Sequence, residues 1–360
     1  MRFPEFSGEW ETKSINDLAD VIGGGTPDTT VKSYWDGGIQ WFTPSEIGKN
    51  KFVDASLRTI TEDGLNNSSA KLLPPNTILL SSRATIGECS LSLRECATNQ
   101  GFQSLVSKNC NVDFLYYLIQ TKKKDLIRKS CGSTFLEISA NEVRKIQVSV
   151  PSDVEQQKIA ELLSLIDKRI ATQNKIIDKF QSLIKGLAVA LTTKGKPNTA
   201  ISQCLECHSS ALQESEVMPN GLYKVFGANG LVGYTDVPQM NGDAILVIKD
   251  GSGVGTVSYA QGKFSVIGTL NYLTVIGNND LRYLYFALSV FNFQPYKTGM
   301  AIPHIYFKDY GKAKIYCPSL AEQKRVANVL DKLESKLFVE QELLASFNQQ
   351  KLYLLGKMFI

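Results

Sequence analysis

The chain has few of the chemical groups on which most enzymes depend. Its 360 residues include only two histidines, so histidine-based acid–base catalysis has little to work with. No stretch approaches eighteen consecutive apolar residues and the N-terminus lacks an apolar signal core, so we expect no membrane partner and a cytoplasmic location. Seven scattered cysteines, an odd number, do not indicate a disulfide framework. The composition, 43% hydrophobic and 21% charged, is that of an ordinary folded protein.

Motifs of known catalytic or cofactor sites are absent or incomplete. Segment 204–208, Cys-Leu-Glu-Cys-His, has the C-x-x-C-H pattern of haem attachment, but that chemistry needs export, and a zinc site needs a second cysteine pair. Gly251, Gly253 and Gly255 lack the lysine of a P-loop and the spacing of a dinucleotide fingerprint. The Asn-Pro-Pro-aromatic motif of base methylation is also missing. We therefore expect no metal, no cofactor and no catalytic centre.

The chain does contain one long internal repeat. When the sequence is laid over itself so that Ile78 falls on Ile245, the two copies align at that one offset across both globular and helical segments. The other aligned pairs include Gly132 with Gly299, Ile138 with Ile305, Pro151 with Pro318, Gln156 with Gln323 and Phe180 with Phe347. Before Ile78 the two copies diverge and differ in length. The sequence therefore predicts one module present twice.

Each copy ends in a long helix with a coiled-coil pattern. Ser152 with Glu155, and Ser319 with Glu322, form S-x-x-E capping boxes that mark the helix starts. Apolar residues then recur at alternating spacings of four and three, which is typical of a coiled-coil seam of about five heptads. The first seam contains Ile159, Leu163, Ile166, Ile170, Gln173, Ile177, Phe180, Ile184, Leu187 and Leu191. The second contains Val326, Leu330, Leu333, Leu337, Glu340, Leu344, Phe347, Lys351, Leu354 and Met358, with Lys351 as an extra break.

These helices are too long for one globule to cover. About 40 residues at roughly 1.5 Å per residue span about 60 Å, so each helix needs a partner, and the other copy is the obvious one. Gln173 and Glu340 are equivalent under the repeat and lie near the middle of their helices. We hypothesise an antiparallel pair in which these two side chains meet and fix the register. The alternative is two separate helices, each lying on its own globule.

The two segments outside the helices carry no net charge. Residues 1–150 contain 17 basic and 17 acidic side chains, and residues 198–316 contain 8 of each. Apolar runs bounded by turn residues, such as 77–80 and 244–248, indicate strands of mixed α/β globules. Aromatic-rich helices, expected in the core, are indicated at 114–119 and 281–288. Nucleic-acid binding would therefore have to depend on charges gathered on one face.

The end of each globule and the start of its helix share a motif. In the first copy it reads Gly132-Ser133-Thr134-(x)3-Ile138, Ile146-x-Val148, then Pro151-Ser152-x-x-Glu155-Gln156-x-x-Ile159-Ala160. In the second it reads Gly299 to Ile305, Ile315, then Pro318-Ser319-x-x-Glu322-Gln323-x-x-Val326-Ala327. This motif resembles the junction of target-recognition domain and spacer helix in the specificity subunits of type I restriction-modification enzymes. The opening, with Trp10, Gly24-Gly25-Thr26-Pro27 and Trp41, is also similar, but the second copy, from about Ile201, lacks that segment.

The resemblance implies a fold and a role. Such subunits hold two inverted target-recognition domains apart on an antiparallel helix pair with pseudo-twofold symmetry, and each domain reads half of a split, asymmetric DNA sequence. The expected domains are target-recognition domain 1 at 1–150, spacer helix 1 and linker at 151–197, target-recognition domain 2 at 198–317 and spacer helix 2 at 318–360. The expected partners are double-stranded DNA, two methylation subunits with S-adenosylmethionine chemistry, and an ATP-driven restriction and translocation subunit. This chain would choose the site and catalyse nothing.

Candidate DNA contacts follow from the chemistry of base edges and phosphates. The candidate base readers are Arg83, Thr85, Gln100 and Gln103 in the first globule, and Lys224, Asn229, Lys249, Ser252 and His304 in the second. The candidate phosphate neighbours are Lys122, Lys123, Lys124, Lys129, Lys263, Lys297 and Lys308. For each of them the alternative is an ordinary solvated surface residue.

Two other functions are compatible with parts of the sequence. A non-catalytic coiled-coil scaffold with protein-binding globules would explain the helices and the neutral globules. An enzyme with a novel site has only the cysteine and histidine cluster at 204–208 in its support. Salt-dependent DNA binding would favour the specificity subunit over both.

Overall fold

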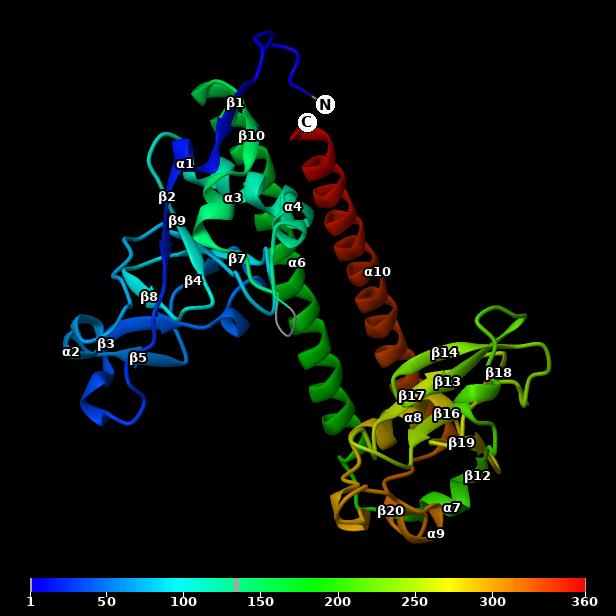
Figure 1. Ribbon diagram of the computed structural model, residues 1–360. Helices are drawn as coiled ribbons and strands as arrows, with labels where there is room; N and C mark the ends of the chain where they lie inside the picture. The colour runs from blue at the N-terminus through cyan, green and yellow to red at the C-terminus, as the bar shows by residue number, and fades with distance from the viewer. Residues whose placement is uncertain (1, 133–135, 360) are drawn as a thin grey trace. The chain divides into compact units, whose positions relative to one another are not determined.

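The computed structural model describes residues 2–132 and 136–359 (Figure 1). Ser133 and Thr134 of the shared motif lie outside the described residues. The chain forms two compact units, and each contains one globule together with parts of both long helices. Unit 1 comprises Met1–Gln173 and Leu343–Ile360, and unit 2 comprises Asn174–Glu342. Within the described residues, no helix is both long and apolar enough to cross a membrane.

Unit 1 contains a five-stranded sheet with the order β2-β9-β6-β7-β4 and a three-stranded sheet with the order β5-β3-β8. The larger sheet consists of β2 (Ala19–Gly23), β9 (Gln103–Ser107), β6 (Ile78–Leu80), β7 (Cys89–Ser92) and β4 (Phe52–Val53). The smaller consists of β5 (Arg58–Ile60), β3 (Trp35–Phe42) and β8 (Cys96–Thr98). A separate antiparallel pair joins β1 (Glu11–Ser14) to β10 (Gln147–Val150). The short helices are α1 (Ile15–Leu18), α2 (Glu62–Asn66), α3 (Val112–Thr121), α4 (Lys123–Arg128) and α5 (Ala140–Arg144).

Unit 2 repeats this plan with fewer elements. One four-stranded sheet contains β12 (Leu205–Ser209), β19 (Leu270–Val275), β16 (Ala244–Ile248) and β17 (Val257–Ala260), in that order. The other contains β14 (Gly230–Thr235), β13 (Tyr223–Gly227), β18 (Lys263–Val266) and β15 (Met240–Asn241). The pair β11 (Thr199–Ala200) and β20 (Lys314–Ile315) matches the β1–β10 pair. The short helices are α7 (Ile201–Cys204), α8 (Leu281–Ser289) and α9 (Phe307–Tyr310).

The aromatic-rich helices lie in the core, as predicted. All six residues of α3 from Phe114 to Ile119 are buried, and they share one cluster with strands of the larger sheet. In α8 the equivalent residues Tyr283, Leu284 and Phe286 are buried in the core of unit 2. Both helices therefore pack an apolar face against a sheet and against a long helix, which fixes each globule on the helix that follows it.

The start of the second copy matches the first at a different spacing from the rest. The backbone N–H of Ile15, the first residue of α1, donates to the carbonyl of Ile146 at 3.0 Å. The N–H of Ile201, the first residue of α7, donates to Ala313 at 3.0 Å, and Ala313 is the repeat equivalent of Ile146. The residues that the second copy lacks therefore fall between its first strand and its central strand. This equivalence was not visible from the single offset of the repeat.

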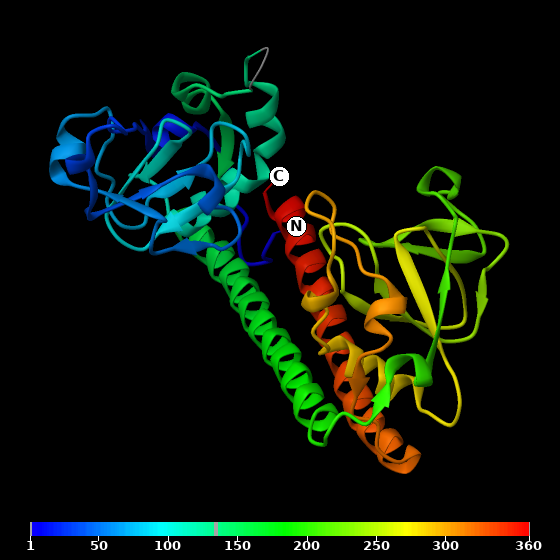
Figure 2. The ribbon, with the colours of Figure 1, turned by 90° about the horizontal axis from the view of Figure 1, so that it is seen from below.

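The two long helices are α6 (Asp153–Thr192) and α10 (Leu320–Met358), each unbroken (Figure 2). Each begins one residue after its capping serine. In unit 1, a buried cluster combines the first part of α6 with the last part of α10, and it includes Ile159, Leu163, Ile166, Leu354, Leu355 and Met358. In unit 2, a buried cluster combines the last part of α6 with the first part of α10: it includes Ala188, Val326, Ala327 and Leu330, and the half-buried Leu187 and Leu191 pack against it.

Each unit therefore shows antiparallel packing of the two helices by itself. Every position of both predicted seams is buried or half-buried, so the heptad pattern correctly identified the packed face. Gln173 is buried in unit 1 and Glu340 is half-buried in unit 2. The alternative of two separate helices is wrong, because in both units the helices share a core as well as contacting a globule.

Candidate nucleic-acid interface

In both globules the same backbone contacts tie the loop after one sheet strand to a segment much later in the chain. We call these contacts the bracket and the loop that they hold the bracketed loop. In unit 1 the N–H of Ile138 donates to the carbonyl of Ser82 at 3.1 Å and so holds the loop after the central strand β6. In unit 2 the loop after β16 is held when Ile305 donates to Lys249 at 2.9 Å. The repeat aligns the two donors with each other and the two acceptors with each other. The two copies therefore share this hydrogen bond between segments that are distant in the chain, in addition to a similar order of strands and helices.

A second pair of contacts completes the bracket. Arg83 forms an antiparallel bridge with Glu137, and the repeat-equivalent residues Asp250 and His304 form the same bridge in unit 2. Glu137 exchanges two backbone hydrogen bonds of 2.9 Å with Cys131, and His304 exchanges bonds of 2.8 and 2.9 Å with Thr298. The backbone frame is thus the same in both units, although the side chains that it presents are chemically different.

Each bracketed loop returns to the sheet through a glycine. Gly87 and Gly255 both have φ near +88°, a conformation that other residues adopt only under strain. The N–H of Gly87 donates to Ser81 at 3.1 Å, and that of Gly255 donates to Ile248 at 2.9 Å. The repeat aligns Gly87 with Val254, so Gly255 comes one position later and the loop of unit 2 is longer by that position. The insertion changes the tip of the loop and leaves its two ends in place.

The predicted base readers of unit 1 lie around this bracket. Nε of Arg83 is 2.8 Å from Oε1 of Glu137, and both side chains are partly exposed. Thr85 is exposed at the loop tip. Gln100 is exposed and accepts a hydrogen bond of 2.5 Å from the hydroxyl of Thr26, in the Gly-Thr-Pro segment.

A further backbone contact brings these segments together. The N–H of Ser82 donates to the carbonyl of Gly101 at 2.8 Å, so the segment with Gln100 lies against the bracketed loop. Gln103 follows at the start of β9 and is half-buried beside Gly23, the last residue of the neighbouring strand. All four predicted readers of this unit therefore belong to one group.

Among the predicted phosphate neighbours of unit 1, Lys123 touches the bracketed loop. Lys123, at the start of α4, forms an ion pair with Glu88, and a Cβ added at Gly87 would meet its side chain. Lys129 is 4.0 Å from Glu142, whereas Lys122 caps the end of α3 and Lys124 is exposed. The predicted phosphate neighbours thus lie on α4 or cap its two ends, and they are not within the bracket.

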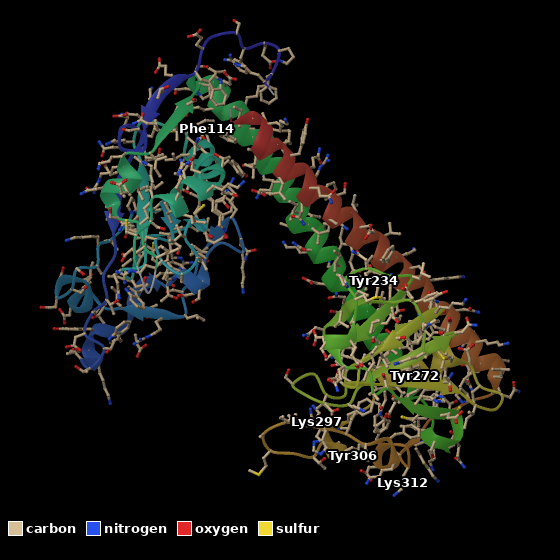
Figure 3. The ribbon with its side chains drawn as sticks, turned by 45° about the vertical axis from the view of Figure 1, so that its right-hand side comes forward. Phe114, Tyr234, Tyr272, Lys297, Tyr306 and Lys312 are labelled. Carbon is tan, nitrogen blue, oxygen red and sulfur yellow. The ribbon has the colours of Figure 1, made fainter. Side chains whose placement is uncertain are left out.

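The predicted residues of unit 2 fall into two groups. The first lies at the bracket: it contains Lys249, Ser252 and His304, with Lys297 and Lys308 on the adjoining segment. His304 is half-buried, and its ring packs against Tyr306 at a centroid distance of 5.0 Å. Lys308 lies with Nζ 5.1 Å from the ring centre of Tyr306. Figure 3 shows Lys297, Tyr306 and Lys312 along one edge of this globule and Tyr234 on the opposite side of its sheets.

The second group belongs to the other sheet of unit 2. Lys224 is on β13 opposite Phe264 of β18, and Lys263 is the first residue of β18, with Nζ 5.6 Å from the ring centre of Tyr223. Asn229 lies in the tight turn between β13 and β14. The sequence grouped these residues with His304 because it could not show that the globule has two sheets.

The glutamines of the shared motif, Gln156 and Gln323, join two parts of each unit, a role that their positions in the sequence did not reveal. Gln156 accepts a hydrogen bond from the N–H of Asn111 at 3.0 Å and donates to the carbonyl of Pro151 at 3.0 Å. Gln323 accepts from the N–H of Asp280 at 2.8 Å and donates to Pro318 at 2.9 Å. Each side chain is 2% exposed. The glutamines therefore join the start of each long helix to the segment before α3 or α8.

Charged contacts strengthen the same joints. The hydroxyl of Tyr117 donates to Asp167 at 2.6 Å in unit 1. Its counterpart in unit 2 is a bond of 3.0 Å from Tyr285 to Glu334, the repeat equivalent of Asp167. Arg282 also pairs with Glu334, at 2.5 Å. In each unit one partner lies on a helix of the globule and the other lies on a long helix. These contacts therefore set the angle at which the globule meets that long helix.

The cysteine and histidine cluster is part of the fold of unit 2. Cys204 is buried in the core, and burial raises the pKa of the Cys207 thiol to about 11. The ring of His208 stacks on Tyr272 at 4.9 Å. Across 2–132 and 136–359, no group of three or more histidine, cysteine or acidic side chains is arranged to hold a metal ion. Cys204 and His208 thus contribute to the packing of unit 2.

Comparison with known families identifies the module. A family model described as the type I restriction modification DNA specificity domain matches residues 7–181 and 207–349. The chain belongs to this family. Both matched segments contain a bracketed loop and the start of a long helix, so the repeated frame described above is that of the specificity domain.

Two curated relatives illustrate the similarity. The MjaIX specificity subunit of Methanocaldococcus jannaschii is 39% identical over 179 residues, which is 48% of this chain and 41% of the relative. The chain thus matches less than half of that protein's length. The EcoprrI specificity subunit of Escherichia coli is 24% identical over 360 residues, which is 91% of this chain and 88% of the relative. Both are named as specificity subunits of type I restriction enzymes.

Solved structures share the fold over the whole chain. The specificity subunit of a type I restriction-modification system from M. genitalium gives a TM-score of 0.64 at 18% identity, covering 100% of this chain and 99% of the other. A chain from a study of complex assembly and conformational transition in a type I system gives 0.60 at 14% identity, with 98% of each chain covered. The chain therefore shares the fold of these two structures over nearly its whole length.

Proposed function

We propose that this specificity subunit binds a split, asymmetric DNA target, with one half read by each globule. The observation that carries the proposal is the bracketed loop. Its backbone contacts recur at the offset of the repeat, but the side chains that it presents are Arg83 and Glu137 in one copy and Asp250 and His304 in the other. A duplicated reader with a constant frame and different side chains is what two unequal half-sites require.

The chemistry of the presented side chains supports base reading. Arginine recognises guanine through paired N–H groups in the major groove, and glutamine recognises adenine. Unit 1 offers Arg83, Thr85, Gln100 and Gln103 at its bracket. Unit 2 offers Lys249, Ser252 and His304, with Lys224 and Asn229 on its second sheet. We propose these as base contacts, and Lys122, Lys123, Lys124, Lys129, Lys263, Lys297 and Lys308 as phosphate contacts.

We propose that the chain is divided into two target-recognition domains and two spacer helices. Target-recognition domains occupy 1–150 and 198–317, and spacer helices occupy 151–197 and 318–360. A helix of 40 residues is about 60 Å long, and its length determines how many base pairs remain unread between the half-sites. Insertion or deletion of whole helical turns is then expected to change this gap without changing the bases recognised.

The long helices also provide surfaces for partner subunits. Apolar side chains outside the packed seam are largely exposed: Leu165 on α6 in unit 1, Phe338 and Val339 on α10 in unit 2, and Leu352 on α10 in unit 1. Contiguous exposed apolar patches mark interaction sites, and Phe338 and Val339 are adjacent on α10. We propose that two methylation subunits dock there, that a restriction and translocation subunit joins them, and that this cytoplasmic chain contributes recognition and no catalysis.

One experiment tests the proposal as a whole. The chain is co-expressed with its methylation subunits, and modified adenines are mapped across a genome. We expect a split motif of two unlike half-sites separated by a fixed gap. Methylation without any sequence motif, or a single uninterrupted motif, would contradict the proposal. A protein-binding scaffold would form complexes without salt-dependent DNA binding.

A further inference from the structure

The bracketed segment of unit 2 presents an exposed apolar tip. Met300 is fully exposed and Ile302 is 67% exposed, and Ala301 between them is exposed too. Three successive apolar residues at the end of a loop have no packing role within the globule. A folded protein that keeps such residues in water generally uses them to contact a partner.

The loop is braced, so this exposure is not the result of an unstructured segment. Thr298 and His304 close it with two backbone hydrogen bonds of 2.9 and 2.8 Å. The carbonyl of Pro303 accepts from the N–H of Gly251 at 2.9 Å, which ties the loop to the neighbouring bracketed loop. Gly299 has φ of +87°, and a Cβ there would overlap the carbonyl oxygen of Ile302. The narrow shape of the tip therefore depends on glycine.

The surroundings of the tip are basic, although the globule is neutral. Lys297 precedes the loop, and Lys312 follows it on the same edge (Figure 3). Lys308 lies between them in the chain, with its Nζ 5.1 Å from the ring centre of Tyr306. The acidic residues of these segments are Asp250, which is half-buried in the bracket, and Asp309. An apolar tip flanked by lysines is suited to a polyanion whose groove contains apolar groups. It is less suited to an apolar protein surface.

The geometry points to one chemical partner. A two-stranded loop fits the major groove of DNA, which is about 12 Å wide, but not the minor groove, which is about 6 Å wide. Within the major groove the one apolar group that a base presents is the C5-methyl of thymine. We infer that Met300 and Ile302 are specificity determinants that contact thymine methyl groups in the half-site bound by unit 2.

This inference rests on the proposed function and adds a kind of readout that polar residues do not provide. We propose that Ser252 and His304 at the same bracket form hydrogen bonds with the edges of bases. The apolar tip instead recognises a methyl group by contacting it and excluding water from it. Each half-site that contains a methylated adenine has a thymine opposite that adenine, so a methyl group is always available for the test.

The test uses the full chain assembled with its methylation subunits and a synthetic duplex that contains the mapped target. Each thymine in both half-sites is replaced in turn by deoxyuridine, which lacks the methyl group, and the dissociation constant is measured at fixed salt. For the wild type we expect a loss of about 3- to 10-fold at one or two positions, all in one half-site, in keeping with the modest value of a single apolar contact.

The variant with Met300→Ala and Ile302→Ala supplies the second arm. We expect it to bind the unmodified target about 3- to 10-fold more weakly than the wild type and to make no distinction between thymine and deoxyuridine. Val237→Ala is the matched control, because Val237 is 77% exposed in the same globule but outside the bracket. It should keep the full discrimination. Thermal unfolding confirms that all three proteins are folded.

Each outcome has a distinct meaning. If deoxyuridine has no effect at any position, or if the double variant still discriminates, the tip does not read methyl groups and the inference is wrong. If the double variant instead loses its methylation subunits in size-exclusion chromatography, the tip is a protein contact and the inference is equally wrong. If the wild type binds cognate and scrambled duplexes alike, the proposed function itself fails.

Discussion

Nζ of Lys351 on α10 lies 2.7 Å from Oδ1 of Asp167 on α6, inside unit 1. The second oxygen of Asp167 accepts the hydrogen bond from Tyr117 on α3. The side chains of Lys351 and Asp167 are only 20% and 15% exposed. One carboxylate therefore connects both long helices to the globule, and the apparent break of the second seam at Lys351 is a polar contact across the helix pair.

Replacement of Lys351 tests the strength of this joint. In Lys351→Met the apolar side chain fits the seam, but Asp167 keeps its charge in a largely buried position without its cation. We expect unit 1 to lose about 1–3 kcal/mol in free energy of unfolding, measured by urea denaturation. Lys324→Met, at an exposed position on the same helix, is the control and should change stability by less than about 0.5 kcal/mol. Equal losses would show that the ion pair contributes nothing specific.

The motif glutamines make a prediction that can be checked in both copies. Gln156→Ala leaves the N–H of Asn111 and the carbonyl of Pro151 without their side-chain partner in a buried place, and Gln323→Ala does the same in unit 2. We expect each substitution to cost about 1–3 kcal/mol in free energy of unfolding. Gln157→Ala, an exposed neighbour on α6, should be almost neutral. A neutral effect at Gln156 would contradict its role as a joint.

The sequence predicted the features that depend on local periodicity. The helix starts, both seams and the buried aromatic helices follow from spacings that any reader of the chain can count. The partner of Lys351 could not be predicted, because the seam gives a face and not the neighbour across it. The match between Ile15 and Ile201 was hidden for a related reason, since missing residues in the second copy shift the alignment there.

The candidate site was predicted less completely than the fold. Arg83, Thr85, Gln100 and Gln103 were chosen by residue type, and the structure brings them to one bracket. Lys224 and Lys263 were chosen in the same way but lie on another sheet, because the parallel pairing of β13 with β18 joins segments that are far apart in the chain. Side-chain chemistry can be read from a sequence, whereas nonlocal strand pairing cannot.

The start of α10 carries a pH-dependent contact. Hydrogen bonds from Arg325 and Lys194 lower the pKa of Glu322 from 4.5 to about 2. Because the folded pKa lies below the unfolded value, the contribution of Glu322 to stability is complete above pH 4.5 and is lost as the pH falls toward 2. The difference in melting temperature between wild type and Glu322→Gln should therefore be largest near neutral pH and shrink below pH 4.5. A difference that stays constant with pH would exclude titration of Glu322 as its source.

Arg83 is the residue of unit 1 whose proposed role is most open to measurement. Its ion pair with Glu137 orients the guanidinium at the exposed bracket, and a paired contact to guanine is worth about 1–3 kcal/mol. We expect Arg83→Ala to weaken binding to the cognate target about 10- to 100-fold, with the loss confined to one half-site. Arg94→Ala removes another exposed, ion-paired arginine of the same globule and serves as the control. If binding to cognate and scrambled DNA fell equally, Arg83 would be a phosphate contact only.

Crosslinking at Gln173 and Glu340 tests the register of the helix pair. Gln173 lines a surface pocket of unit 1 together with Phe347, which lies two helical turns, or roughly 10 Å, beyond Glu340 along α10. When cysteines replace Gln173 and either Glu340 or Phe347, a short-arm crosslinker shows which of the two positions lies next to residue 173. Crosslinking of 173 to 340 at least as fast as to 347 would support the pairing of the equivalent polar residues. Crosslinking to 347 alone, or, in matched variants with the second cysteine at 326 or 358, crosslinking to either of those positions, would move the centre of the pair away from Gln173, so that another layer must fix the distance between the two readers.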